Sequence, residues 1–188
     1  MIGVQDLRKG ATILEDGELW RVLEYQHVKG GRGNATIRVK VRNLRSGGTM
    51  EKTYPSGSRA NDVRLDHATV QYLYNDGDLY YFMDTETHEQ PAISAKMLGN
   101  TVNFLVDGTM LELESWEGAP INIELPTTVD MEVIQTDPGF AGDTATNATK
   151  PATVSTGYMA HVPLFVTTGD VIRIDTRTGE YLTRVSAG

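Results

Sequence analysis

The sequence predicts an all-β chain built from three small barrels. Three observations support this prediction: short segments that alternate apolar and polar residues, turn residues at close and fairly even spacing, and a charge balance that changes twice along the chain. The 188 residues show no alternation of strands with helices that would imply a parallel sheet. Modules of roughly 60 residues are marginal alone, so we expect the barrels to pack on one another.

The strands are predicted from segments with a period of two. Residues 36–42, TIRVKVR, alternate in this way, and residues 49–54 and 129–134 are similar, as half-buried strands should be. Residues 93–98 are the one segment that resembles a helical turn. Turns are predicted where residues that tolerate positive φ cluster, at residues 15–17, 46–48, 75–78, 106–108 and 177–179.

The charge balance divides the chain into three parts. Residues 1–63 hold 11 Lys and Arg against 7 Asp and Glu, residues 64–126 hold 2 against 11, and residues 127–188 hold 4 against 7. These shifts, with Pro126 interrupting the strand pattern, predict boundaries after residues 63 and 126. A basic first part on a chain of net charge -8 favours a polyanionic partner at that end. Uneven surface charge without a function explains the same counts.

The composition argues against several classes of protein. The chain has no cysteine, so it can form neither a disulfide framework nor a thiolate nucleophile or metal site. No segment approaches the roughly 18 consecutive apolar residues of a membrane helix. The first ten residues, MIGVQDLRKG, lack the pattern of a secretory signal. We therefore expect a cytoplasmic protein with no membrane partner.

Motifs for catalysis or cofactor binding are weak. Residues 30–33 match a GxxG loop, but they lie between strand-like segments and lack the Lys-Ser/Thr pair of a phosphate-binding loop. The histidines show no metal-ligand spacing, and no G-x-S-x-G motif is present. Asp76 with Asp78, and Asp84 with Glu86, fall in or beside predicted turns, where solvated acids are common. We expect no enzyme, no metal and no cofactor.

The strongest candidate site is a glycine-flanked arginine in the segment HVKGGRGNATIRVKVRN, residues 27–43. Gly30, Gly31 and Gly33 allow the backbone to turn tightly, so Arg32 is expected to project from the tip of a hairpin. A guanidinium group in that position suits a phosphate or a nucleotide base.

A basic stripe follows this tip. Arg38, Lys40 and Arg42 share one face of the predicted strand, about 6.6 Å apart, and can follow a nucleic-acid backbone. An ordinary solvated barrel face explains the same pattern, and the residues alone leave both interpretations open.

Three separated blocks of sequence together resemble the bacterial elongation factor P family. They are YQHVKGGRGNATIRVKVRNLRSGGTMEKTY, QYLYNDGDLYYFMDTETHEQ and TDPGFAGDTATNATKPATVSTGYMAHVPLFVTTGDVIRIDTRTGEYLTRV. The resemblance implies an SH3-like, KOW-type barrel over residues 1–63, followed by OB-fold barrels over residues 64–126 and 127–188. It also implies an L-shaped outline that imitates a tRNA.

The resemblance further implies a translation elongation factor. Such a factor binds the ribosome between the peptidyl and exit sites and relieves stalling at consecutive prolines, while the ribosome remains the catalyst. The expected partners are ribosomal RNA and proteins, peptidyl-tRNA and possible exit-site mRNA, and the expected state is a monomer. The alternative is an OB-fold single-stranded RNA-binding protein or RNA chaperone that acts off the ribosome. It would need basic grooves, whereas both predicted OB segments are acidic.

The resemblance assigns roles to individual residues. Arg32, between Gly31 and Gly33, would reach toward the CCA end of the peptidyl-tRNA. In the branch of the family that attaches rhamnose to its tip arginine, asparagine follows directly, whereas Gly33 intervenes before Asn34 here. We therefore expect Arg32 to act unmodified, or at least without rhamnose, and an unknown modification is the alternative. The candidate RNA contacts are Lys29, Arg38, Lys40, Arg42, Tyr181 and Arg184.

One loop of the last barrel is also assigned by the resemblance. Gly142, Asp143 and Thr144 match an exit-site loop of the family that reads the mRNA codon or the nearby ribosome. A plain Asp-Thr turn that closes a barrel is the alternative explanation.

Overall fold

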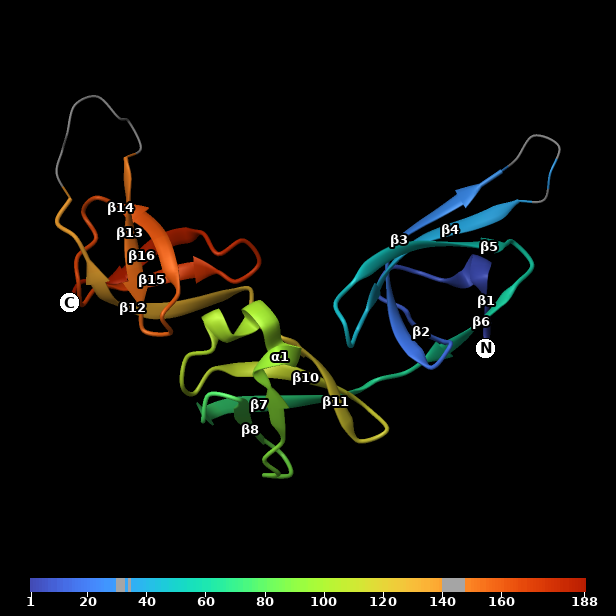
Figure 1. The fold of residues 1–188 in the computed structure, drawn as a ribbon, viewed down its shortest axis with the longest axis horizontal. Helices are drawn as coiled ribbons and strands as arrows, with labels where there is room; N and C mark the ends of the chain where they lie inside the picture. The colour runs from blue at the N-terminus through green and yellow to red at the C-terminus, as the bar shows by residue number, and fades with distance from the viewer. Residues whose placement is uncertain (30–32, 34, 140–147) are drawn as a thin grey trace. The chain divides into compact units, whose positions relative to one another are not determined.

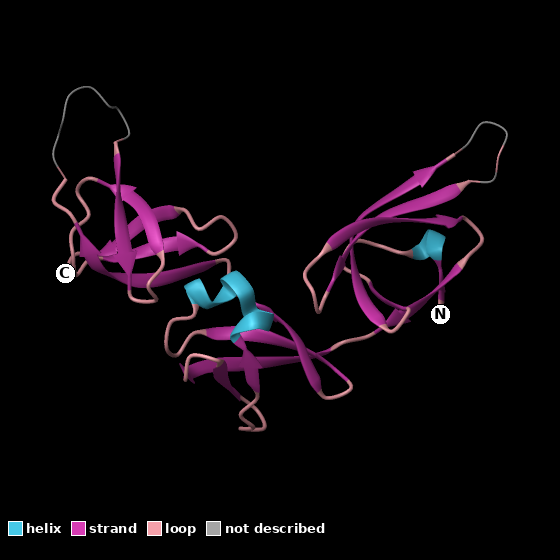
Figure 2. Cartoon of the chain, viewed as in Figure 1, coloured by secondary structure: helices cyan, strands magenta, loops and turns pink. Residues whose placement is uncertain are grey.

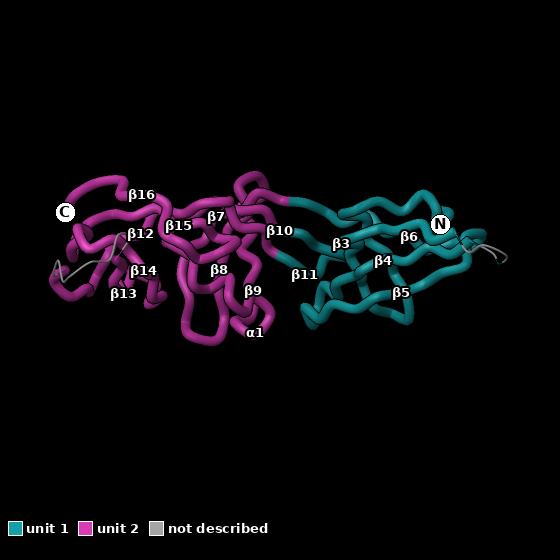
Figure 3. The backbone as a smooth tube through the Cα atoms, turned by 90° about the horizontal axis from the view of Figure 1, so that it is seen from above, with its two compact units in different colours: residues 1–67, 114–122 teal, residues 68–113, 123–188 magenta. Residues whose placement is uncertain are grey.

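A computed structural model describes residues 1–29, 33, 35–139 and 148–188 of the protein. These residues form three sheets of short strands, with helix confined to a few short segments (Figures 1 and 2). The chain divides into two compact units, residues 1–67 with 114–122, and residues 68–113 with 123–188 (Figure 3). In the described part of the chain, no helix has the length and apolar character needed to cross a membrane.

The first sheet has the strand order β1-β6-β2-β3-β4-β5. Its strands are β1 (Ile2–Gly3), β2 (Thr12–Glu15), β3 (Glu18–Val28), β4 (Thr36–Asn43), β5 (Thr49–Pro55) and β6 (Arg59–Val63), with the 3₁₀ helix η1 (Val4–Asp6) after β1. The alternation predicted for residues 36–42 is confirmed. Ile37, Val39 and Val41 of β4 are fully buried in the barrel core, and the residues between them are exposed.

The turn predicted at residues 15–17 joins β2 to β3. Asp16 and Gly17 both have positive φ, 53° and 77°, which is the backbone that a tight two-residue hairpin requires. The pairing Glu15↔Glu18 follows directly from this turn and sets the register of the two strands.

The second sheet has the order β11-β10-β7-β8-β9. Its strands are β7 (Asp66–Asn75), β8 (Leu79–Asp84), β9 (Ala92–Ser94), β10 (Met110–Trp116) and β11 (Ala119–Glu124). Its hydrophobic core includes Val70, Tyr72 and Phe82. Tyr72 of β7 pairs with Phe82 of β8.

The helical turn predicted at residues 93–98 is displaced in the structure. Ile93 belongs to β9, and the helix α1 spans Ala95–Leu98, because the Ser94 side chain accepts a hydrogen bond from the backbone N–H of Met97 and caps its first turn. A 3₁₀ helix, η2 (Gly99–Phe104), continues from it. The sequence GNTVNF gave no helical signal, since none of these residues is a strong helix former.

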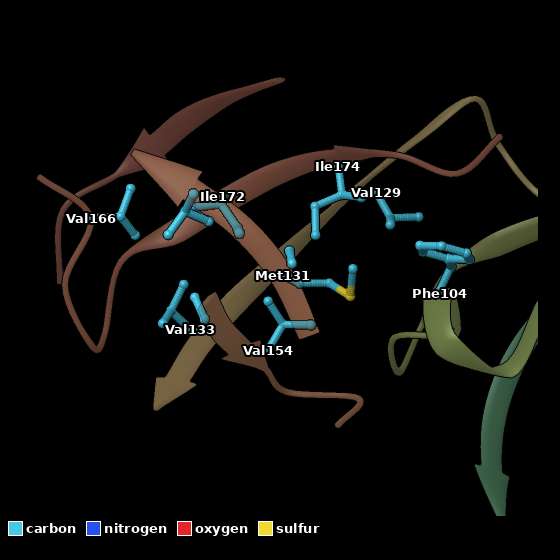
Figure 4. Packing of buried hydrophobic residues seen from close by; sticks show 11 residues of the cluster. Phe104, Val129, Met131, Val133, Val154, Val166, Ile172 and Ile174 are labelled. Carbon is cyan, nitrogen blue, oxygen red and sulfur yellow. The ribbon is translucent and has the colours of Figure 1, made fainter. Parts of the chain in front are cut away.

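The third sheet has the order β14-β13-β12-β15-β16. Its strands are β12 (Thr128–Thr136), β13 (Thr149–Val154), β14 (Met159–Pro163), β15 (Val171–Asp175) and β16 (Tyr181–Ser186). Its core includes Met131, Val154 and Ile172, together with Phe104, which comes from η2 (Figure 4). The core of the third barrel is thus completed by a side chain from the preceding module.

Candidate functional site

The long hairpin of β3 and β4 leads to the predicted arginine tip. The two strands stay paired as far as Val28↔Thr36, beyond the last buried side chain of the barrel, and His27, Val28 and Lys29 are exposed. The described pairing therefore continues one residue pair past the buried Ile37, and the end of β3 is exposed to solvent.

The tip itself is described only in part. Gly33 is exposed, and a side-chain carbon placed on it would meet no atom of the described residues within 4 Å. Gly31 and Arg32 lie outside the described residues. Their assigned roles remain predictions.

The structure places the basic stripe on the outer face of β4, with carboxylates on both neighbouring strands. Arg38 Nε lies 3.1 Å from Glu51 on β5, and Lys40 Nζ lies 3.3 Å from Glu24 on β3. All four side chains are about half exposed. Exposed ion pairs of this kind contribute roughly 0–1 kcal/mol each, so a phosphate group could displace the carboxylates at small cost.

Arg42 differs from the other two cations of the stripe. Among the described residues, no carboxylate oxygen lies within the 4.0 Å of an ion pair from its guanidinium group. Glu24 and Glu51 were missed by sequence reasoning because strand register, rather than sequence spacing, brings them beside the stripe.

The two candidate residues of β16 make intramolecular contacts. Tyr181 is half-buried and packs against the core of the third barrel. The Arg184 guanidinium lies 3.5 Å from the buried carboxylate of Asp170 and 5.1 Å from the centre of the Phe165 ring. Phe165 is 57% exposed, so Arg184 and Phe165 together offer an apolar and charged surface to a partner.

The predicted exit-site loop is described only at its base. Gly142, Asp143 and Thr144 lie outside the described residues. At the base, the buried Lys150 donates a hydrogen bond of 2.6 Å to the main-chain carbonyl of Asp137. The Thr136 hydroxyl donates to the main-chain carbonyl of Pro151. The base is therefore held by contacts from side chains to the backbone, which depend on tertiary packing and not on a local sequence pattern.

The acid pairs considered for catalysis act as turn caps. Asp76 Oδ1 accepts hydrogen bonds from the backbone N–H groups of Asp78 and Leu79, and Asp84 Oδ1 accepts two from Glu86 and Thr87. These bonds hold the pKa of both aspartates below the ordinary value. An acid that is ionised so readily is a poor proton donor near neutral pH. Within the described residues, no cluster of His, Asp or Glu is arranged to hold a metal ion.

Three family models match successive parts of the chain. The elongation factor P KOW-like domain matches residues 3–59, the elongation factor P OB domain matches residues 65–123, and the elongation factor P C-terminal domain matches residues 129–184. An SH3-like barrel followed by OB-fold barrels, as expected, is therefore the architecture of this chain, and it defines a ribosome-associated translation factor. The chain belongs to the elongation factor P family.

Full-length relatives agree with this assignment. The chain is 49% identical over 185 residues to the elongation factor P of Ruminiclostridium cellulolyticum, covering 98% of this chain and 100% of the relative. It is 47% identical over 184 residues to that of Symbiobacterium thermophilum, with the same coverage. The protein is accordingly a translation elongation factor.

A solved structure shares the fold. Eukaryotic translation initiation factor 5A from Methanococcus jannaschii matches with a TM-score of 0.54 and 23% identity, over 66% of this chain and 91% of that chain.

Proposed function

We propose that this elongation factor binds the ribosome between the peptidyl and exit sites and relieves stalling at consecutive prolines. The observation that supports the proposal best is the β3–β4 hairpin, whose strands stay paired one residue pair past the last buried side chain and lead to the segment containing Arg32. In this proposal the tip would extend past its own barrel and enter a site that the barrel cannot. Arg32 would then contact the CCA end of the peptidyl-tRNA.

The proposed mechanism is positioning rather than acid-base chemistry. Proline has a fixed φ, and a peptidyl-prolyl end is easily held in a geometry that is unproductive for attack. Holding two reactants in the correct geometry removes a large entropic part of the barrier. The guanidinium group suits this role because it carries a permanent charge and several hydrogen-bond donors in a rigid plane. The ribosome remains the catalyst.

The remaining candidate residues would divide among the other partners. The acceptor arm of the peptidyl-tRNA would be contacted by the basic stripe, Arg38, Lys40 and Arg42, and by Lys29. The elbow of the same tRNA would be contacted by Tyr181 and Arg184. Gly142, Asp143 and Thr144 would contact the mRNA or the nearby ribosome at the exit site. We further propose a cytoplasmic monomer divided after residues 63 and 126.

Translation of a reporter containing three consecutive prolines tests the function directly. In a purified translation system, adding the protein should increase full-length product from this reporter, and a matched reporter with three alanines should be unaffected. Equal effects on both reporters would contradict a role in proline stalling.

The alternative, a single-stranded RNA-binding protein acting off the ribosome, predicts tight binding to short oligonucleotides. The proposed ribosomal factor should bind them weakly. Tight binding to short free RNA, together with no effect on the proline reporter, would favour the alternative.

We also propose that Arg32 acts without covalent modification. Protein purified from its native source should have the mass of the encoded chain. A heavier mass that maps to the peptide containing Arg32 would contradict this proposal.

A further inference from the structure

The middle barrel carries a stacked pair of tyrosines, one exposed and one half-buried, whose position depends on a β-bulge. Strand β7 pairs with β8 through Tyr72↔Phe82 and then through Tyr74↔Tyr81, so Leu73 is the extra residue of the bulge. The bulge sets Tyr74 directly opposite Tyr81. Tyr72 and Phe82 are buried in the core, whereas Tyr74 is 53% exposed.

The two rings form a stacked surface. Their centroids lie 4.7 Å apart and their planes differ by 20°. The Tyr81 hydroxyl donates a hydrogen bond of 3.0 Å to Asp76 Oδ2, which fixes the orientation of its ring. A rigid aromatic face that remains in water is a common feature of binding surfaces.

The turn beside this stack is strongly acidic. The backbone N–H of Leu79, the Tyr81 hydroxyl and the backbone N–H of Asp78 donate hydrogen bonds to the Asp76 carboxylate and lower its pKa, which favours the ionised form. Asp78 is also exposed. Residues 66–94, which contain β7 to β9, hold six Asp and Glu and no Lys or Arg. The field at the tyrosines therefore favours cations and repels phosphate groups.

The position of the stack in the barrel is itself informative. OB folds bind extended ligands on the face of their second and third strands and at the loop between their first two strands. Here β7 and β8 are the first two strands of the OB module, and Tyr81 and Asp76 lie at the corresponding strand and loop. Surfaces of this fold that bind single strands combine aromatic rings with a basic groove. This one keeps the rings but has the opposite charge.

We propose that an acidic tyrosine patch on the middle barrel binds an arginine-rich segment of a protein partner. The patch consists of Tyr74, Tyr81, Asp76 and Asp78. A guanidinium group stacks on the exposed Tyr74 ring, and a neighbouring cation pairs with the Asp76 carboxylate. The patch binds protein rather than RNA because of its charge. This proposal does not depend on the role of the Arg32 tip, which lies in another barrel.

Binding of a short labelled peptide of alternating arginine and glycine to the full-length protein tests the patch. Tyr74→Ala should weaken binding roughly two- to fivefold, the range of an exposed cation–π contact. Tyr74→Phe should bind like the parent protein, since the ring remains. The lysine version of the peptide should bind more weakly than the arginine version, because ammonium groups stack less well.

The chain provides a matched control for charge. Asp76→Asn and Asp84→Asn remove the same charge from the same kind of turn cap, and both retain an oxygen that can accept the backbone hydrogen bonds. Asp84 lies at the opposite end of β8 from the stack. Asp76→Asn should therefore weaken peptide binding more than Asp84→Asn, and it should flatten the dependence on salt more strongly.

Several outcomes would overturn the proposal. Equal losses for Asp76→Asn and Asp84→Asn, with no loss for Tyr74→Ala, would show diffuse attraction between a basic peptide and an acidic protein. Tighter binding of oligouridine than of the peptide, lost in Tyr74→Ala, would assign the patch to RNA. If Tyr74→Ala does not fold, the ring proton resonances of Tyr74 and Tyr81 in the parent protein decide the matter. They should shift on peptide addition, and unchanged resonances would exclude the patch.

Discussion

The guanidinium of Arg21, on β3, donates hydrogen bonds of 2.9 Å from Nη2 to both carboxylate oxygens of Glu114, on β10. The two side chains are only 18% and 5% exposed, and the amide of Asn122 donates a further bond of 2.8 Å to the same carboxylate. All three residues belong to the first compact unit. An ion pair with a buried carboxylate thus joins two segments of that unit that are far apart in the sequence.

Removing one partner of this pair should destabilise the first unit. Glu114→Gln leaves the largely buried charge of Arg21 uncompensated, and we expect the free energy of unfolding to fall by about 3 kcal/mol. Both tryptophans of the chain, Trp20 and Trp116, lie in this unit, so urea unfolding followed by tryptophan fluorescence reports on it. The matched control is Glu51→Gln, which breaks the exposed pair with Arg38 and should cost at most about 1 kcal/mol. If both variants lost the same free energy of unfolding, burial of the Glu114 carboxylate would not explain the stability of this unit.

Substitution of the predicted tip should separate activity from stability. We expect Arg32→Ala to abolish the increase in full-length product from the triple-proline reporter, while melting temperature and ribosome binding stay unchanged. Arg32→Lys should retain part of the activity, because it preserves the charge and loses the planar set of donors. A variant that lost stability together with activity would point to a structural role instead.

The members of the basic stripe should contribute unequally to ribosome binding. Replacing Arg38, Lys40 and Arg42 together by glutamine should weaken association and flatten its salt dependence by up to about 0.9 in the logarithmic slope per lost phosphate contact. As a single change, Arg42→Gln should have the largest effect, because Arg38 and Lys40 must first leave Glu51 and Glu24. Association constants measured over a salt series check this order. A slope that does not change in the triple variant would identify the stripe as a solvated face.

Phe104 should be required for the stability of the third barrel. It is 7% exposed, and its ring lies 5.2 Å from that of Tyr158. Phe104→Ala should reduce the stability of this barrel by about 3 kcal/mol, and Phe104→Leu should reduce it less because more of the space stays filled. Hydrogen exchange of the β12 and β15 amides measures the effect locally. Unchanged protection in Phe104→Ala would show that the contact contributes little.

Acid should destabilise the C-terminal barrel through Asp175. The Arg177 guanidinium and the backbone N–H of Arg177 lower the pKa of Asp175 to about 2, from an ordinary value of 3.8. Because the folded-state pKa is lowered, the ionised carboxylate stabilises the fold above pH 3.8, and this contribution is lost as the pH falls toward 2. Asp175→Asn should therefore show a smaller decrease in melting temperature between pH 4 and pH 2. Circular dichroism melts of the parent and variant decide this, and parallel decreases would contradict it.

Local patterns in the sequence predicted most of the architecture. The alternation in residues 36–42 and the turn at Asp16-Gly17 depend on neighbouring residues, so they could be identified before the structure was known. The contacts of Arg38 and Lys40 could not be identified, because they depend on the register between strands. The burial of Asp170 beneath Arg184, and the bulge at Leu73, depend on tertiary packing that no local pattern encodes.

The contribution of η2 to the third barrel has a consequence for the order of folding during synthesis. Phe104 is synthesised before every strand of the third barrel. Its ring therefore cannot be buried in that core until β12 to β15 have been synthesised. Residues 127–188 produced alone would lack this side chain and carry a cavity in its place. The last barrel is therefore not an independent part that recombination could move into another protein without residues from its neighbour.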